Sequence, residues 1–251
     1  MPLWMQAFAW GAIAGGALLI GSAIAWRWTV PPQAVAFVMA FGAGVLISAL
    51  AFELVGEAQE TGGLVPTMSG FLVGAVVYVA ANGALARLGA RHRKRSGGQQ
   101  PSEAEVSGSG NAIALGALLD GIPESVVLGL GLVGGASVNP AVLVAIFISN
   151  VPEGLSSTAG MKRSGRSSRY VFGLWGGIAV VSGLASLVGY TLLAGASGVT
   201  IAFITAIATG AILAMVADTM IPEAFERQHM LTGLITALGF LVAFVVHALS
   251  G

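Results

Sequence analysis

Long apolar runs are the feature that most restricts what this chain can fold into. A helix that crosses the hydrocarbon core of a bilayer needs about 20 predominantly apolar residues. Eight runs meet that length, at about residues 4–26, 32–55, 64–90, 111–134, 138–160, 170–195, 199–222 and 231–250. We therefore predict an all-α, polytopic membrane protein with eight transmembrane helices.

Composition agrees with a single transmembrane domain over residues 1–251. Only 9% of the residues are charged, against about 25% in soluble domains, so the chain has too few charges to cover a surface in water. The 37 glycines suit membrane helices that pack closely. Cysteine is absent, which excludes disulfides and thiolate metal ligands. We expect contact with the lipid bilayer and no nucleic-acid partner.

One long polar segment, residues 91–110, separates the third and fourth runs. It is rich in serine, glycine, glutamine and charged residues, a composition typical of a mobile loop rather than a domain. Contact of Arg91–Arg95 with anionic lipid is one interpretation of its basic run. Membrane topology alone accounts for that run, and we prefer this simpler interpretation.

Lysine and arginine positions assign the two sides of the membrane. With eight spans, all of these residues fall at the ends of the first, third, fifth and seventh spans or in the loops that follow. They are Arg27, Arg87, Arg91, Arg93, Lys94, Arg95, Lys162, Arg163, Arg166, Arg169 and Arg227. Basic residues are enriched on the cytoplasmic side, so we expect loop 91–110 in the cytoplasm and both termini outside, in a bacterial-type inner membrane. Glu53, Glu57 and Glu60 lie on the other side, where an acidic mouth would gather cations, although an ordinary acidic loop explains the last two.

Two apolar runs carry a carboxylate beside a proline near their middle, in Leu119–Ser125 and Ser149–Gly154. A charged side chain at the bilayer centre costs about 3 kcal/mol, and a proline inside a helix costs a similar ~3 kcal/mol. This combination on two successive spans indicates that the protein holds something positively charged there.

Helical spacing brings the polar groups of these two spans to one height. The spans are antiparallel, and Asp120, Glu124, Ser149, Asn150 and Glu153 fall within a band of about five residues, or ~7 Å. Asp120 and Glu124 are four residues apart and share a helix face, as do Ser149 and Glu153. If the two faces meet, we expect an oxygen-lined pocket at the bilayer centre.

Such a pocket needs a counter-charge. Pro123 and Pro152 leave two backbone carbonyls without their helical donors, and three carboxylates in low dielectric cannot all stay ionised alone. Among a proton, an alkali ion and a divalent cation, the mixed oxygen ligands favour a hard or borderline divalent ion. The alternative is a purely structural role, in which protonated acids hold neighbouring helices together. Two such motifs at the same depth make this alternative the weaker one. A third Pro–Glu pair, Pro222–Glu223 with Asp218 before it, fits an exit-side relay or an interfacial helix end equally well.

The chain resembles the ZIP (Zrt/Irt-like) family of divalent metal transporters. The likeness covers the whole chain through its eight spans, its external termini and its loop after span three. The family's span-four motif, His-Asn-x-Pro-Glu-Gly, stands here as Asp120–Ser125, and Ser149–Gly154 matches the span-five motif apart from a leading histidine. Phe41–Leu46 is similar to the start of the family's second span.

This resemblance implies a primary metal site made by Asp120, Glu124 and Glu153, to which we add Asn150 and Ser149 as auxiliary ligands. The positions that would complete a second ion site hold Gly121, Asn150 and Thr219. Stronger ligands are expected at these positions, so we expect one full site. No histidine lies at mid-membrane, and an all-oxygen site leans toward manganese, iron(II) or magnesium rather than zinc. The resemblance also implies two bundles, with spans one, four, five and six moving against the other four, and it allows a homodimer.

Our prediction is a carrier, not an enzyme, that moves a divalent metal cation (zinc, iron, manganese or similar) toward the cytoplasm. The metal is its transported substrate, and no cofactor is expected. The alternative is a proton- or sodium-coupled carrier of a small organic solute that uses the same acids as a relay. An intramembrane aspartyl protease that uses Asp120 and Asp218 is disfavoured, because their depths differ by about five residues, ~7 Å.

Overall fold

The computed structural model describes residues 1–96, 99–135 and 137–250. Residues 97 and 98 of the expected loop, residue 136 in the turn between spans four and five, and residue 251 lie outside this description, as do the side chains of Arg227, Gln228 and Ser250. The described chain forms helices and connecting loops without a strand, and eight of its helical segments are long and apolar enough to cross a membrane. The all-α, multi-pass fold is therefore confirmed.

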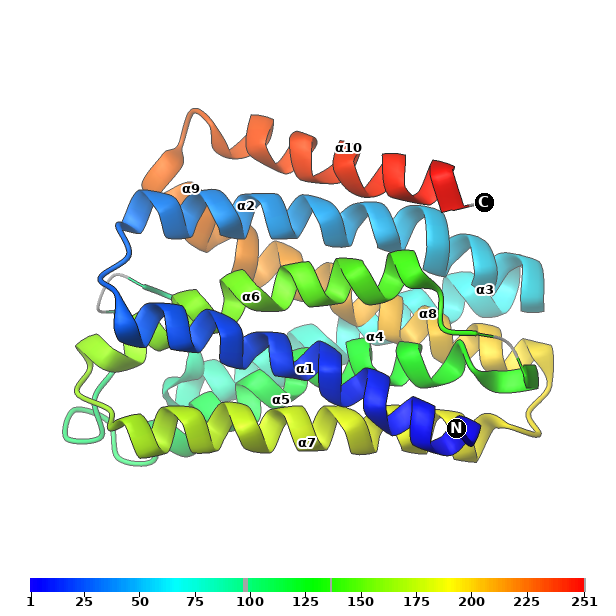
Figure 1. Cartoon of the computed structure of the whole chain (residues 1–251), viewed down its shortest axis with the longest axis horizontal. Coiled ribbons are helices and arrows are strands. Elements are labelled where there is room, and N and C mark those ends of the chain that lie inside the picture. The colour runs from blue at the N-terminus through cyan, green and yellow to red at the C-terminus, as the bar shows by residue number, and fades with distance from the viewer. Residues whose placement is uncertain (97–98, 136, 251) are drawn as a thin grey trace.

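The long helices run side by side, with both termini at one end (Figure 1). Their bounds are Leu3–Arg27 (α1), Pro32–Ala49 (α2), Leu64–Leu85 (α4), Ser109–Leu130 (α5), Pro140–Arg163 (α6), Ser168–Leu193 (α7), Gly198–Met215 (α8) and Thr232–Ser250 (α10). Two short helices, Val55–Gly62 (α3) and Ile221–Gln228 (α9), extend α2 and α8. We call the end that holds both termini the terminal end and the opposite end, where α1 finishes at Arg27, the basic end.

Two spans are longer than the sequence indicated. The second continues from α2 through a π-helical turn, Leu50–Leu54, into α3, and the seventh continues from α8 through a second such turn, Val216–Met220, into α9. Pro222 does not stop the seventh span, and it lies in the first turn of α9, directly after the π-helical turn Val216–Met220. The acidic residues after Glu53 therefore belong to a helix, not to a loop.

Close backbone contacts at glycines divide the spans into two bundles. One contains α1, α5, α6 and α7, and the other contains α2, α4, α8 and α10. Among the described residues, the glycines at which a Cβ would overlap the backbone of another span all join helices of the same bundle. Examples are Gly154 against Leu18, Gly74 against Ile207, Gly44 against Thr236 and Gly129 against Ser186. Small residues let membrane helices approach this closely.

Between the bundles, the glycines of the described residues approach closely but without such overlap. Where α2 faces α6, a Cβ at Gly42 would lie 3.1 Å from Pro152 Cγ and 3.3 Å from Ser149 Cα. Helix α6 is the most enclosed of the spans and α10 the least. The helix that carries Glu153 therefore sits inside the assembly, at the boundary between the two bundles.

Candidate cation site

The sequence-predicted polar residues are buried in the middle of α5 and α6. Asp120 and Glu124 lie one turn apart on α5, and Ser149, Asn150 and Glu153 lie on α6. Each is at most 5% exposed, although α5 and α6 otherwise present mainly apolar side chains. Carboxylates placed this deep need a partner.

The partner is a cation from the protein itself. Lys94 Nζ lies 3.3 Å from Asp120 Oδ2 and 2.7 Å from Glu153 Oε2. The carboxylates of two antiparallel helices thus converge on one nitrogen atom, as the depth-matched spacing predicted. Lys94 is 3% exposed, so this ion pair is shielded from solvent.

Arg93 provides a second cation at Asp120. Its guanidinium donates from Nη2 to Asp120 Oδ1 at 2.8 Å and from Nε to Oδ2 at 2.9 Å, a bidentate arrangement that is strong and directional. Tyr78 on α4 donates its hydroxyl to Oδ1 at 2.6 Å, and Asn82 accepts from Arg93 Nη1 at 2.7 Å. Burial acts to lower the pKa of Arg93, but Asp120 beside it outweighs this effect and holds the pKa above its ordinary value.

The remaining predicted ligands differ in how well they are paired. Glu124 Oε1 is buried and has no hydrogen-bond partner within the described part of the chain. Ser149 donates its hydroxyl to the Ile146 carbonyl at 2.9 Å, and Asn150 donates its amide to the Ala14 carbonyl of α1 at 2.9 Å. Among the described residues, no three histidine, cysteine or acidic side chains are arranged to hold a metal ion directly. Lys94 fills the place where an ion would meet Asp120 and Glu153.

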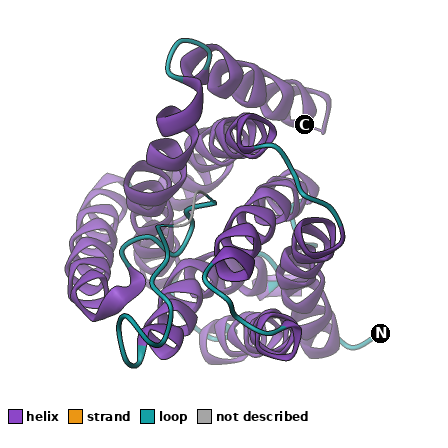
Figure 2. Ribbon diagram, turned by 90° about the vertical axis from the view of Figure 1, so that its left-hand side faces the viewer, coloured by secondary structure: helices purple, strands orange, loops and turns teal. Residues whose placement is uncertain are grey.

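The interpretation of residues 91–110 as a mobile loop is wrong for its first part. Arg93, Lys94, Ser96 and Gln100 are between 1% and 3% exposed. We call Arg93–Ser96 the basic plug. Gln100 fixes it by donating to the carbonyls of Arg93 and Ser157, at 2.7 and 3.0 Å. Loops at the basic end lie over and between the helix ends (Figure 2). Buried carboxylates draw in these cations because an unpaired buried charge is costly.

The third Pro–Glu pair also contacts the plug. Glu223 is 2% exposed and accepts from the Ser96 backbone N–H at 2.9 Å, from Ser96 Oγ at 2.6 Å and from Ser156 Oγ at 3.2 Å. Arg95 lies 3.5 Å from Glu223 and also pairs with Glu226. Asp218 is exposed and accepts one long hydrogen bond, 3.4 Å, from Asn82. Glu223 is therefore a buried binding group and not an exposed helix end.

The later part of the loop is held at the basic end by Glu103. Its carboxylate accepts from Arg166 at 2.7 Å and from the backbone N–H groups of Gly108 and Gly110, at 2.5 and 3.1 Å. These hydrogen bonds, the one from Arg166 first, lower the pKa of Glu103 to about 2.

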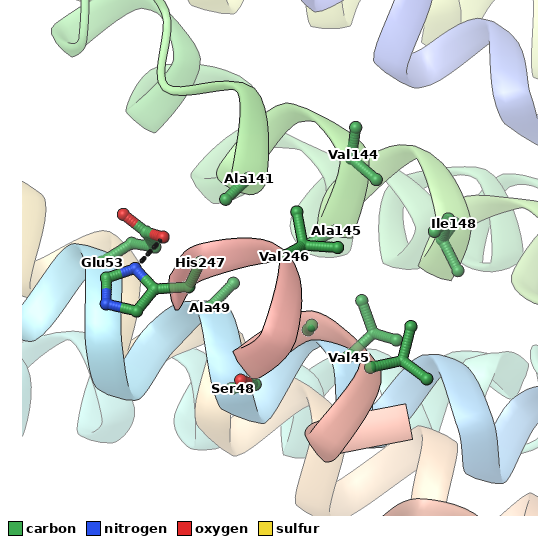
Figure 3. A pocket seen from close by; sticks show the side chains of 12 residues that line it. Val45, Ser48, Ala49, Glu53, Ala141, Val144, Ala145, Ile148, Val246 and His247 are labelled. Carbon is green, nitrogen blue, oxygen red and sulfur yellow. Dashed lines mark hydrogen bonds and ion pairs between the residues drawn. The ribbon is translucent and has the colours of Figure 1, made fainter. Parts of the chain in front are cut away.

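A small cavity of about 20 Å³ lies toward the terminal end, between α2, α6 and α10 (Figure 3). At its mouth His247 Nδ1 lies 2.5 Å from Glu53 Oε1, and Asn139 donates to the other oxygen of Glu53. The inner wall is apolar and includes Val45 and Ile148, the latter directly before Ser149. The buried acids are therefore covered by apolar side chains on one side and by the basic plug on the other.

Sequence reasoning missed five contributors to this site, namely Tyr78, Asn82, Arg93, Lys94 and Ser96. The three acids were expected to need a counter-charge. The signal that could have identified it is the basic run Arg91–Arg95, which precedes the fourth span in the sequence. Asp120 is 27 positions from Arg93, so no local pattern links them.

Neither a comparison with models of known protein families nor a comparison with curated protein sequences gives a match for this chain.

Proposed function

We propose that this chain carries a divalent metal cation across a membrane through the buried acids of α5 and α6. The observation that carries the proposal is the convergence of Asp120 and Glu153, from antiparallel helices, on a single cationic atom. The resemblance of Asp120–Ser125 and Ser149–Gly154 to the ZIP motifs supports the same function. Zinc, iron and manganese are the candidate ions, and Glu124, with its unpaired buried oxygen, is a further ligand.

Charge balance favours a divalent ion over a monovalent one. Arg93 and Lys94 together place two positive charges at Asp120 and Glu153. One divalent cation would supply the same charge after both side chains leave. The available oxygens come from carboxylates, an amide, a hydroxyl and proline-freed carbonyls, which are ligands for hard or borderline ions.

The orientation in the membrane follows from charge placement. The basic end collects the lysines and arginines, so we assign it to the cytoplasm and both termini to the outside of an inner membrane. With the proposed transport toward the cytoplasm, the ion would enter near Glu53 and His247 and leave near Glu223 and Glu226.

Metal uptake into proteoliposomes tests the proposal. Glu153→Gln and Glu124→Gln should each abolish uptake of Mn²⁺ or Zn²⁺, because each removes a charged ligand while keeping the side-chain shape. Glu60→Gln, at an exposed residue on α3, is the matched control and should transport normally. Circular dichroism and a monodisperse gel-filtration peak would establish that the variants fold. Normal uptake in both site variants would refute the proposed site.

One observation favours the alternative carrier of an organic solute. The buried acids already bind a guanidinium and an ammonium group, so a small organic cation is chemically compatible with them. Calorimetric titration separates the two functions. Binding of a guanidino compound without binding of Mn²⁺ or Zn²⁺ would favour the organic solute.

A further inference from the structure

We propose that the basic plug is a tethered competitor of the transported cation, and that it locks the two bundles together while it occupies the site. This inference rests on the proposed function and adds its regulation. Residues 93–96 would leave when a divalent ion takes their place among the carboxylates.

The plug presents its cations to a row of carboxylates. Arg93 meets Asp120, Lys94 meets Glu153, and Arg95 meets Glu223 and Glu226. Glu226 is exposed on α9, whereas the other three acids are buried. The row therefore leads from the enclosed acids of α5 and α6 to the surface of the basic end. A diffusing cation would meet these same carboxylates, so plug and ion compete for them.

Two glycines make room for the plug. A Cβ at Gly116 on α5 would lie 2.5 Å from Arg93 Cδ, and a Cβ at Gly160 on α6 would overlap the Arg95 carbonyl oxygen and the Gln100 amide. Both glycines face the plug and not a neighbouring span. The absence of side chains at Gly116 and Gly160 thus lets residues 93–96 pack closely against α5 and α6.

The plug also bridges the two bundles. Arg93 bonds Tyr78 and Asn82 of α4 on one side and Asp120 of α5 on the other. Farther along, Ser96 donates to Glu223 of α9, while the Lys94 carbonyl accepts from Ser156 of α6 at 2.5 Å. Elsewhere the two bundles approach without overlap at their glycines, as at Gly42 beside Pro152. Bonds to both sides make the plug a clamp that must loosen before one bundle slides past the other.

Competition predicts how the plug changes metal affinity. When a site is open in only a fraction of the molecules, its apparent dissociation constant is the intrinsic constant divided by that fraction. Loosening the plug should therefore lower the KM for Mn²⁺. We expect a decrease of about tenfold, which corresponds to a site that is open in roughly one molecule in ten.

Two variants loosen the plug by different means. Lys94→Gln removes the charge that pairs with Glu153. Lys162→Gln is its control, since the polar partners of Lys162 in the described part of the chain are backbone carbonyls of α1 and the ring of Trp26. Gly160→Ala displaces the plug and leaves every charge in place, with Gly173→Ala as its control because a Cβ at Gly173 meets open space. Both test variants should lower the KM for Mn²⁺ uptake, and both controls should match the wild type.

Thiol labelling provides a readout that does not depend on transport. The chain has no cysteine, so Ser96→Cys creates a single thiol in the plug, and Ser168→Cys creates one at an exposed position of α7. A membrane-impermeant maleimide should label the Ser96 variant slowly, and Mn²⁺ should speed that labelling several-fold. The Ser168 variant should label rapidly with and without Mn²⁺.

The outcomes separate the two proposals. If uptake requires Glu153 but Lys94→Gln and Gly160→Ala keep the wild-type KM, and Mn²⁺ leaves labelling unchanged, the plug is a fixed structural element and this inference is wrong. If neither the wild type nor the plug variants bind or transport Mn²⁺, Zn²⁺ or Fe²⁺, the proposed function fails and the inference fails with it.

Discussion

Replacing Asp120 by asparagine should destabilise the protein more than any other single loss of charge at the site. Asp120 accepts hydrogen bonds from Tyr78 and twice from Arg93, and it also contacts Lys94. The Asp120→Asn side chain would keep the shape but leave the Arg93 guanidinium, 3% exposed, without its counter-charge. Removing one partner of a buried ion pair costs about 3–5 kcal/mol. At roughly 2–4 °C per kcal/mol for a chain of this size, the melting temperature should fall on the order of 10 °C.

Thermal unfolding in detergent, followed by tryptophan fluorescence, measures this change. Asp218→Asn is the matched control, because Asp218 is exposed and accepts one long hydrogen bond among the described residues; it should change stability by at most about 0.5 kcal/mol. The double variant Arg93→Met with Asp120→Asn removes both charges and should regain part of the loss. A single variant that melts like the wild type, or a double variant less stable than the single one, would show that the pair is not buried as described.

Two further predictions concern packing and pH. Gly154→Ala should cost about 1–3 kcal/mol, because its Cβ would overlap the Leu18 backbone oxygen, whereas Gly83→Ala, which meets open space, should be nearly neutral; melting temperatures of the two variants compare them directly. The Glu103 carboxyl, with its pKa lowered from 4.5 to about 2, should stay ionised in the folded protein under mildly acidic conditions. Its contribution to stability is complete above pH 4.5 and is lost as the pH falls toward about 2, and a carbon-13 titration that gave an ordinary carboxyl pKa would contradict its bonds to Arg166 and the loop.

Features encoded along single helices could be predicted from the sequence. Apolar runs of spanning length located all eight spans, and spacing along α5 and α6 placed Asp120 and Glu153 at one height. The predicted end of the second span was wrong, because polar side chains there belong to a continuous helix. Polar residues after Glu53 resemble a loop, but a π-helical turn carries the helix on to Gly62.

The counter-charge of the site could not be predicted, because it comes from a distant segment with a misleading local composition. Arg93 and Lys94 lie in a stretch rich in serine, glycine and charge, which is typical of solvent-exposed linkers. Their burial depends on carboxylates of two other segments and on the space left by Gly116 and Gly160. Only the assembled helices create that environment, so no window of sequence contains the information.

The glycine contacts have a consequence for any spectroscopic study of this protein. Within each bundle, neighbouring backbones such as those at Gly74 and Ile207 lie so close that relative displacement would require them to separate first. Distances between probes on the same bundle should consequently stay constant during the transport that we propose. Pairs of spin labels that join the bundles, such as one on α7 and one on α4, would then report movement of one bundle against the other, and pairs within a bundle would supply internal standards.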